Sequence, residues 1–163
     1  MAWYFTDPVI VPQAMTDLST TAKLTPGTIR QAKDSSYGVG EFIYLGGVAS
    51  CAAKDWVTYN LDDRTVTRLA ANAIGPVAIA MAACTASYYG WFQISGEALG
   101  NCLTQMASGN RVWITGTAGS VDDASVAGDG VHNAKATATA TVGDLYTSFA
   151  ISRPFVDDFT SFS

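Results

Sequence analysis

Hydrophobic residues are concentrated in one stretch, residues 69–96, which contains no Asp, Glu, Lys or Arg. Large and small side chains alternate along residues 77–84, and a second alternation runs through residues 88–96. A period of two is typical of β-strands, whose successive side chains point to opposite faces. The short polar segment 85–87 suits a hairpin connection, so the pattern predicts a buried antiparallel pair of strands.

Shorter aromatic and β-branched runs flank this stretch, separated by turns rich in Gly, Asp and Pro. They lie at residues 41–45, 55–60, 64–69, 109–116 and 145–152, the last ending before Pro154. The second and third runs predict a hairpin. Short strands with turn signals at this spacing predict an all-β domain, a small antiparallel β-barrel or sandwich. The low-complexity segment 134–142 fits either a strand of small residues or a loop.

The first 36 residues follow a different pattern, with recurrent prolines, frequent Thr and Ser, and poor hydrophobic periodicity. This pattern predicts an extended N-terminal arm, residues 1–36, followed by a β domain, residues 37–163. The arm carries apolar clusters that would be a liability in water. These clusters supply the first candidate interface residues, Trp3, Tyr4, Phe5, Val9 and Ile10. Two placements are open, an edge strand packed on its own domain or a segment docked on a neighbouring molecule.

Composition fits a component of an assembly. Of the 163 residues, only 14% are charged and 48% are hydrophobic, which indicates that more surface than usual is buried against a partner. Nucleic acid is not expected as the main partner, because the net charge is −5 and the nine basic residues are scattered. No membrane span is expected, because polar residues and Pro76 interrupt the uncharged stretch, and most of its apolar content is alanine.

Cysteine usage predicts buried free thiols. Cys51, Cys84 and Cys102 are an odd number at wide spacings, without the CxxC pattern of a redox or zinc site. Free cysteine is among the most buried residue types. The opening residues have neither the basic start nor the long apolar run of a secretory signal, so synthesis in a cytosol is expected.

Residues suited to catalysis or metal binding are sparse. The single histidine is His132, and no GxSxG, GxxxxGK[ST] or GxGxxG motif occurs. Aspartate pairs at 62–63, 122–123 and 157–158 lack the ligand spacing of a calcium loop, so they predict turns. We therefore expect no catalytic residue, cofactor or metal.

Tryptophans at 56, 91 and 113 fall in predicted strands. They could line a sugar- or ligand-binding face, but tryptophan more commonly lies at core edges and at protein interfaces. Trp91 and Trp113 share their strand faces with polar residues such as Gln93 and Arg111. Trp91 and Trp113 therefore complete the candidate interface set, with a core position as the alternative.

Four segments carry a family resemblance: GEFIYL at 40–45, DWVTYN at 55–60, RLAANAIGPVA at 68–78 and YGWFQISG at 89–96. In this order they resemble the head decoration, or cement, proteins of tailed bacteriophages. The likeness covers residues 37–158, and the YGWxQxxG element is its most characteristic part. The resemblance implies a non-enzymatic virion protein, commonly a homotrimer, that binds the major capsid protein on the outside of the head. It brings no site residues.

Two other classes are open. A carbohydrate-binding β module of a tail fibre or cell surface would place an exposed tryptophan in a groove. A small β-barrel enzyme using the aspartate pairs would bring carboxylates together in a pocket. These arrangements distinguish the classes in a structure.

Overall fold

The computed structural model describes residues 2–6, 11–103 and 105–158, which form one all-β domain and so confirm the predicted class. No helix occurs in these ranges, and hence none that could cross a bilayer. The strands in chain order are β1 (Tyr4–Phe5), β2 (Ile29–Asp34), β3 (Gly38–Gly46), β4 (Trp56–Tyr59), β5 (Val66–Arg68), β6 (Gly75–Ala80), β7 (Tyr89–Asn101), β8 (Arg111–Ile114), β9 (Val121–Asp122), β10 (Gly130–Ala136) and β11 (Tyr146–Val156).

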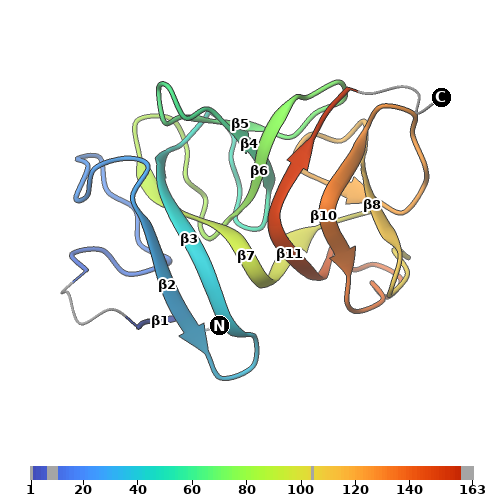
Figure 1. The fold of residues 1–163 in the computed structure, drawn as a ribbon, viewed down its shortest axis with the longest axis horizontal. Coiled ribbons are helices and arrows are strands. Elements are labelled where there is room, and N and C mark those ends of the chain that lie inside the picture. The colour runs from blue at the N-terminus through green and yellow to red at the C-terminus, as the bar shows by residue number, and fades with distance from the viewer. Residues whose placement is uncertain (1, 7–10, 104, 159–163) are drawn as a thin grey trace.

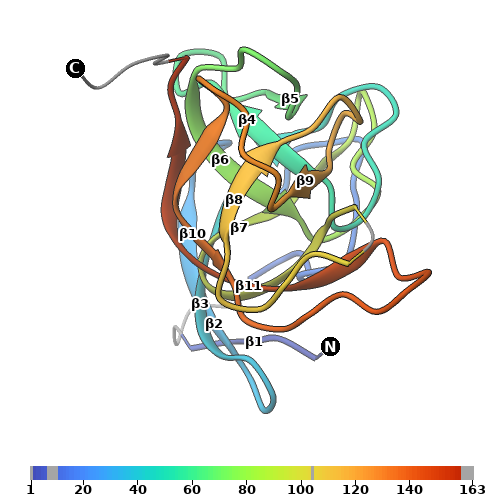
Figure 2. The ribbon, with the colours of Figure 1, turned by 90° about the vertical axis from the view of Figure 1, so that its right-hand side faces the viewer.

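All eleven strands belong to one antiparallel sheet that does not close into a barrel. Its main path runs β1-β2-β3-β7-β6-β11-β10-β8-β9, and β4 pairs with β5 and β6 beside this path. The strands β2 and β3 stand at one side of the molecule, and β8, β10 and β11 stand at the other (Figure 1). Figure 2 shows how the strands from β4 to β11 curve around the interior, while the β2–β3 hairpin extends below them.

The predicted central pair of strands is confirmed. Strands β6 and β7 are antiparallel, with Ile79 opposite Gln93 and Ala80 opposite Phe92. Their connection, residues 81–88, is longer than the three-residue turn that the sequence indicated. The predicted hairpin is also present, as β4 and β5, and so is the predicted strand at β8.

Strand β7 bends and pairs with two different strands along its length. Residues 89–95 pair with β3, and residues 95–101 pair with β11. The change of partner lies at Gly96, whose φ is +99° and whose Cβ, if present, would lie 2.6 Å from the carbonyl oxygen of Val39. Glycine is required there because both the left-handed backbone and the close approach exclude a side chain.

The last strand does not end before Pro154, so this boundary prediction is wrong. Strand β11 continues to Val156, and its pairing with β10 skips from Ile151 to Phe155. Arg153, with φ +47°, lies in the skipped part. A proline is tolerated at such an irregularity because no ladder hydrogen bond is needed from it. Of the segment 134–142, residues 134–136 end β10 and the rest form a loop.

Buried side chains form three clusters along the sheet. The first lies under the N-terminal residues and contains Trp3, Phe42 and Trp91. The second lies between β3, β4, β6 and β7. The third fills the C-terminal side around Trp56 and Phe149, whose rings meet edge to face at 5.0 Å between centroids.

Residues 1–36 contribute strands to the same sheet. Strand β2 pairs with β3 over its whole length, and β1 adds an edge strand to β2. Of the two placements left open by the sequence, the described part of this segment therefore packs on its own domain. The boundary at residue 36 falls in the turn of the β2–β3 hairpin, so it does not separate two packing units.

Candidate interaction surfaces

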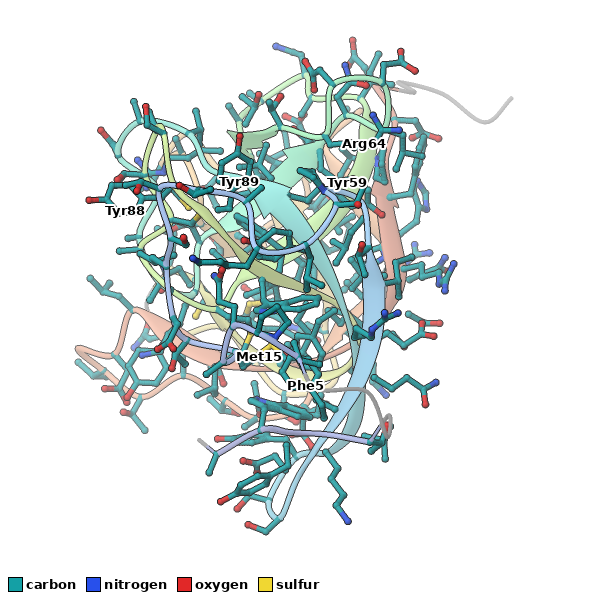
Figure 3. The ribbon with its side chains drawn as sticks, turned by 90° about the vertical axis from the view of Figure 1, so that its left-hand side faces the viewer. Phe5, Met15, Tyr59, Arg64, Tyr88 and Tyr89 are labelled. Atoms are coloured by element: carbon teal, nitrogen blue, oxygen red, sulfur yellow. The ribbon has the colours of Figure 1, made fainter. Side chains whose placement is uncertain are left out.

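Two of the candidate interface tryptophans lie in the core. Trp3 is 8% exposed and Trp91 is 1% exposed. The rings of Phe42 and Trp3 meet edge to face with their centroids 4.9 Å apart, and the ring centroids of Phe5 and Trp91 are 5.3 Å apart. Phe5 lies where the N-terminal segment crosses the sheet (Figure 3). The indole N–H of Trp91 donates to the carbonyl oxygen of Gln13 at 3.2 Å. Neither tryptophan can therefore anchor a contact with another molecule.

The polar neighbour of Trp91 does not mark an exposed face. In the sequence, the polar Gln93 on the same strand face as Trp91 indicates a face exposed to solvent. In the structure Gln93 is itself buried, and its amide donates to the carbonyl oxygens of Ser95 and Glu97. Because β7 lies in the middle of the sheet and both of its faces are covered, the polar residue does not mark an exposed side.

The remaining candidates divide into three groups. Tyr4 is exposed, and Phe5 is half-buried against Trp91. Trp113 is half-buried on the outer face of β8. Val9 and Ile10 lie outside the described residues.

The β2–β3 hairpin projects beyond the rest of the sheet (Figures 1 and 2). Gly38, with φ +72°, closes its three-residue turn, as hairpins of this length require. One carboxylate oxygen of Asp34 accepts hydrogen bonds from the N–H groups of Ser36 at 2.7 Å and Tyr37 at 3.2 Å. The other accepts from the N–H of Ala2 at 2.7 Å. Asp34 therefore fixes both the turn and the start of β1.

One side of this hairpin exposes apolar groups. Tyr4, Lys33 and Val39 form a row across β1, β2 and β3, and we call these three residues the hairpin face. Tyr4 is 65% exposed and Val39 is 58% exposed. The next row, from Phe5 through Ala32 to Gly40, points to the opposite side, which the buried cluster covers. Tyr4 and Val39 therefore expose apolar surface on either side of the charged Lys33, and exposed apolar surface of this kind is typical of an interaction site.

The hydrogen bonds of Asp34 predict that the hairpin turn is sensitive to acid. The bond from Ser36 is the largest cause that lowers the pKa of Asp34 from its ordinary value of 3.8, and bonds from Ala2 and Tyr37 add to it against an opposing effect of burial. A lowered pKa means that this contribution to stability is present above the unfolded-state pKa and is lost as pH falls through the folded-state value. We expect the amide resonances of Ser36 and Tyr37 to titrate with a midpoint below 3.8, measured by nuclear magnetic resonance. Asp34→Asn should abolish the titration, and a midpoint above 4 would contradict it.

A groove of about 390 Å³ lies on the outer face of β8 and β10. Trp113 and His132 face outward there, because their neighbours Val112 and Val131 are buried in the core and strand residues alternate. Gly130 is directly opposite Trp113, and a Cβ on that glycine would lie 3.7 Å from the indole nitrogen. The indole therefore lies alongside a position that has no side chain.

Polar side chains line the same groove as this indole. The imidazole Nε2 of His132 lies 3.2 Å from a carboxylate oxygen of Asp157, and about two fifths of each side chain is exposed. Asn133 is exposed at a bulge in β10, with φ +58°, and Arg111 is exposed at the start of β8. All of these residues line the groove, so an aromatic ring, a carboxylate, an imidazole, an amide and a guanidinium meet around one hollow.

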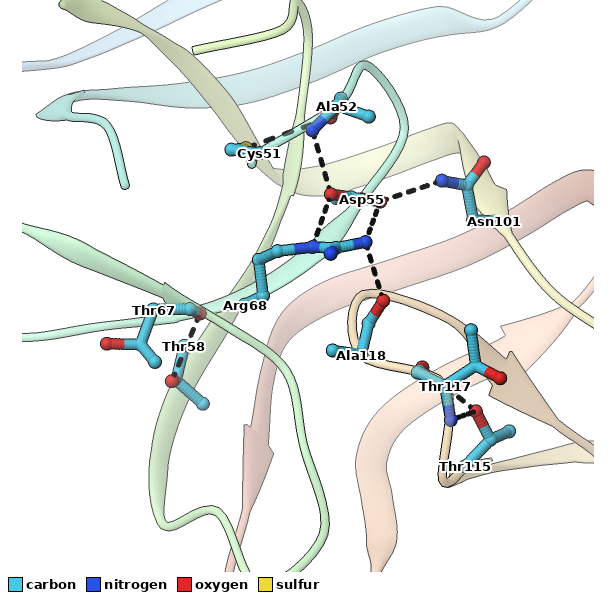
Figure 4. A network of polar contacts seen from close by, with 10 residues as sticks. All are labelled: Cys51, Ala52, Asp55, Thr58, Thr67, Arg68, Asn101, Thr115, Thr117 and Ala118. Atoms are coloured by element: carbon cyan, nitrogen blue, oxygen red, sulfur yellow. Dashed lines mark hydrogen bonds and ion pairs between the residues drawn. The ribbon is translucent and has the colours of Figure 1, made fainter. Parts of the chain in front are cut away.

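A buried aspartate, Asp55, connects several strands and loops (Figure 4). One carboxylate oxygen accepts from the amide of Asn101 at 2.9 Å, and the other accepts from the N–H of Ala52 at 2.8 Å and lies 2.8 Å from Nε of Arg68. The guanidinium of Arg68 also donates to the carbonyl oxygen of Ala118 at 2.7 Å. The Asp55 side chain is 2% exposed, and these contacts hold β4, β5, β7 and the 115–120 turn together.

The aspartate pair 62–63 lies in a turn, as predicted, whereas Asp122 ends strand β9 and Asp123 follows it. Asp63 accepts hydrogen bonds from the N–H and hydroxyl of Thr65, and the main-chain N–H of Ala107 donates to Asp123. These bonds lower the pKa of both carboxyls. Asp62 and Asp63 border a second hollow, of about 490 Å³, and one carboxylate oxygen of Asp63 is engaged within the turn. Across the described ranges, no group of three or more His, Cys, Asp or Glu is placed to hold a metal ion.

The three cysteines are free and buried, which confirms the prediction. Burial raises the pKa of Cys51 and Cys102 to about 11 and that of Cys84 to about 12. Because the thiolate is the reactive form, these thiols are unreactive members of the core near neutral pH.

Comparison with known proteins adds no assignment. Neither a family model, a curated protein nor a solved structure matches the chain. Two surfaces of the described residues are candidates for binding, the hairpin face and the groove.

Proposed function

We propose that the protein is a structural subunit of a bacteriophage virion, a decoration or cement protein that stabilises the head. In this proposal it assembles as a homotrimer on the outer surface of the capsid and binds the major capsid protein. The observation that carries the proposal is the projecting hairpin with Tyr4 and Val39 exposed on one face. The resemblance of four sequence segments to cement proteins and the low fraction of charged residues support it.

The hairpin face suits docking on a second molecule. A side chain on a projecting hairpin has little of its own domain nearby to cover it, so burial of Tyr4 and Val39 requires a partner. Each 100 Å² of apolar surface buried there would contribute about 2.5 kcal/mol before the costs of association. Asp34 and Gly38 already fix the hairpin, which limits the ordering entropy lost on binding.

Stabilisation of a shell follows from mass action. A ligand that binds only the assembled lattice lowers its free energy by an amount set by the ratio of concentration to dissociation constant, and repeated sites add these increments. A trimer gains further, because once one subunit docks, the other two experience a high effective concentration of sites.

The hairpin face provides the test of this proposal. We expect the double variant Tyr4→Thr, Val39→Thr to bind undecorated heads at least ten-fold more weakly, a loss of about 1.4 kcal/mol or more, because two exposed anchors are removed. Threonine keeps the β propensity of both positions. The measurement is the copy number per head over a range of protein concentrations.

The matched control is Val142→Thr, which makes the same change at an exposed valine in the β10–β11 loop. Equal affinity of the double variant and the control would contradict the role of the hairpin face. Sedimentation of the isolated proteins should give trimers in all three cases, and monomers in the unmodified protein would remove the trimer from the proposal. Deletion of residues 2–12 is a poorer test, because it removes Trp3 from the core.

A further inference from the structure

We propose that the groove around Trp113, His132 and Asp157 is a carbohydrate site that takes a neutral sugar ring. This proposal goes beyond the proposed role on the capsid and does not depend on it, since the groove and the hairpin face lie on different strands. It assigns Trp113 as the surface on which the ring stacks and the polar groups as partners of its hydroxyls.

Trp113 provides an aromatic platform. Of the four tryptophans, Trp3, Trp56 and Trp91 are buried, and only Trp113 keeps part of its ring in solvent. The glycine opposite, Gly130, leaves the outer surface beside the indole clear. The face of a sugar ring carries C–H groups with slight positive charge, which are attracted to the negative face of an indole.

Planar polar groups line the groove next to this platform. Asp157 and His132 are held together at 3.2 Å and remain partly exposed, so each has hydrogen-bonding capacity directed to solvent. Asn133 sits at a β-bulge in a left-handed conformation, and such bulges redirect side chains next to functional sites. A carboxylate and an amide each offer two atoms in one plane, which matches neighbouring hydroxyls on a sugar.

Two other ligand classes, anions and purely apolar molecules, fit this hollow less well. The hollow, about 390 Å³, is within the range of small-molecule sites, about 300–1,000 Å³. An anion would meet the carboxylate of Asp157 on a protein whose net charge is already −5. A purely apolar ligand would bury Arg111 and Asp157 without hydrogen bonds from the ligand. A neutral polyhydroxylated ring satisfies both the indole and the polar groups.

The test uses the full chain and a defined panel of neutral trisaccharides built from glucose, galactose, mannose or N-acetylglucosamine. We expect at least one trisaccharide to bind saturably in calorimetric titration and to reduce acrylamide quenching of the tryptophan fluorescence. Trp113→Ala should weaken binding at least ten-fold, and Trp113→Tyr should weaken it less, since the ring is retained. Asp157→Asn should weaken it several-fold. Tyr88→Ala, at an exposed ring in the β6–β7 connection, is the matched control and should bind as the unmodified protein does.

Three outcomes would overturn the proposal. The first is the absence of saturable binding across the panel at millimolar concentrations, and the second is binding that Trp113→Ala leaves unchanged. The third is conversion of a trimer to a monomer by Trp113→Ala, which would make Trp113 a subunit contact. Circular dichroism confirms that each variant is folded. Because Asp157→Asn should decorate heads normally, loss of sugar binding and loss of shell binding are separately observable.

Discussion

Replacement of Asp55 by alanine is expected to lower the free energy of unfolding by about 3 kcal/mol. The Asp55 side chain is 2% exposed. Its carboxylate pairs with the guanidinium of Arg68 and accepts hydrogen bonds from the N–H of Ala52 and the amide of Asn101. Its removal leaves these donors without their acceptor, and the cost of an unpaired buried group exceeds the modest net gain of the bond itself. We place the value at the lower end of the range for broken buried pairs, because Arg68 is 30% exposed and water replaces part of the interaction.

Two variants make this expectation specific. Asp55→Asn keeps the shape and one acceptor, so it should cost about 1–2 kcal/mol less than Asp55→Ala. Asp62→Ala removes an exposed carboxylate in a turn and should stay within about 0.5 kcal/mol of the unmodified protein. Urea unfolding with an unchanged slope measures all three. A loss below 0.5 kcal/mol for Asp55→Ala would contradict the role assigned to the network.

The strands that were predicted correctly carry a strong two-residue period. In β6 and in residues 89–96 of β7 the large residues recur on alternate positions and no charge interrupts them, so the sequence alone indicates buried strands. Strand β2 lacks this signal. Its inward positions are Ala32 and Asp34, because the bulk on that side of the sheet comes from Trp3 and Phe42. A strand whose buried residues are small or polar cannot be recognised from its own hydrophobicity, so the sequence predicts an arm there instead of a strand.

The groove could not be predicted for a different reason. Trp113, His132 and Asp157 are 19 and 25 residues apart in sequence and come together only through the pairing of β8, β10 and β11. No local sequence motif indicates how β8, β10 and β11 pair with one another. The sequence identifies Trp113 as an interface candidate, with a core position as the alternative. It predicts a turn for the aspartate pair at 157–158, whereas Asp157 follows β11 and contacts His132. Reading such a site requires the strand order, which the sequence does not fix.

Adjacent glycines at the end of β3 provide the sharpest steric contrast in the molecule. A Cβ on Gly46 would meet a ring carbon of Tyr89 at 3.6 Å, which is an ordinary van der Waals contact. A Cβ on Gly47 would lie 2.0 Å from the carbonyl oxygen of Cys84 and 2.5 Å from that of Thr85. Both obstacles on Gly47 are main-chain atoms, which cannot rotate away as a side chain can.

Gly47→Ala is therefore expected to cost about 3 kcal/mol or more, while Gly46→Ala should cost less than about 1 kcal/mol. The clash has no easy relief, because the N–H of Gly47 donates to Tyr88 at 2.8 Å and the N–H of Val48 donates to Cys84 at 3.2 Å, so moving this segment breaks bonds to the β6–β7 connection. For a domain of this size, 3 kcal/mol corresponds to a fall in melting temperature of roughly 6–12 °C. Thermal unfolding followed by circular dichroism measures both variants under the same conditions. Equal melting temperatures for Gly46→Ala and Gly47→Ala would show that the β6–β7 connection does not pack against Gly47 as described, since only that contact distinguishes the two positions.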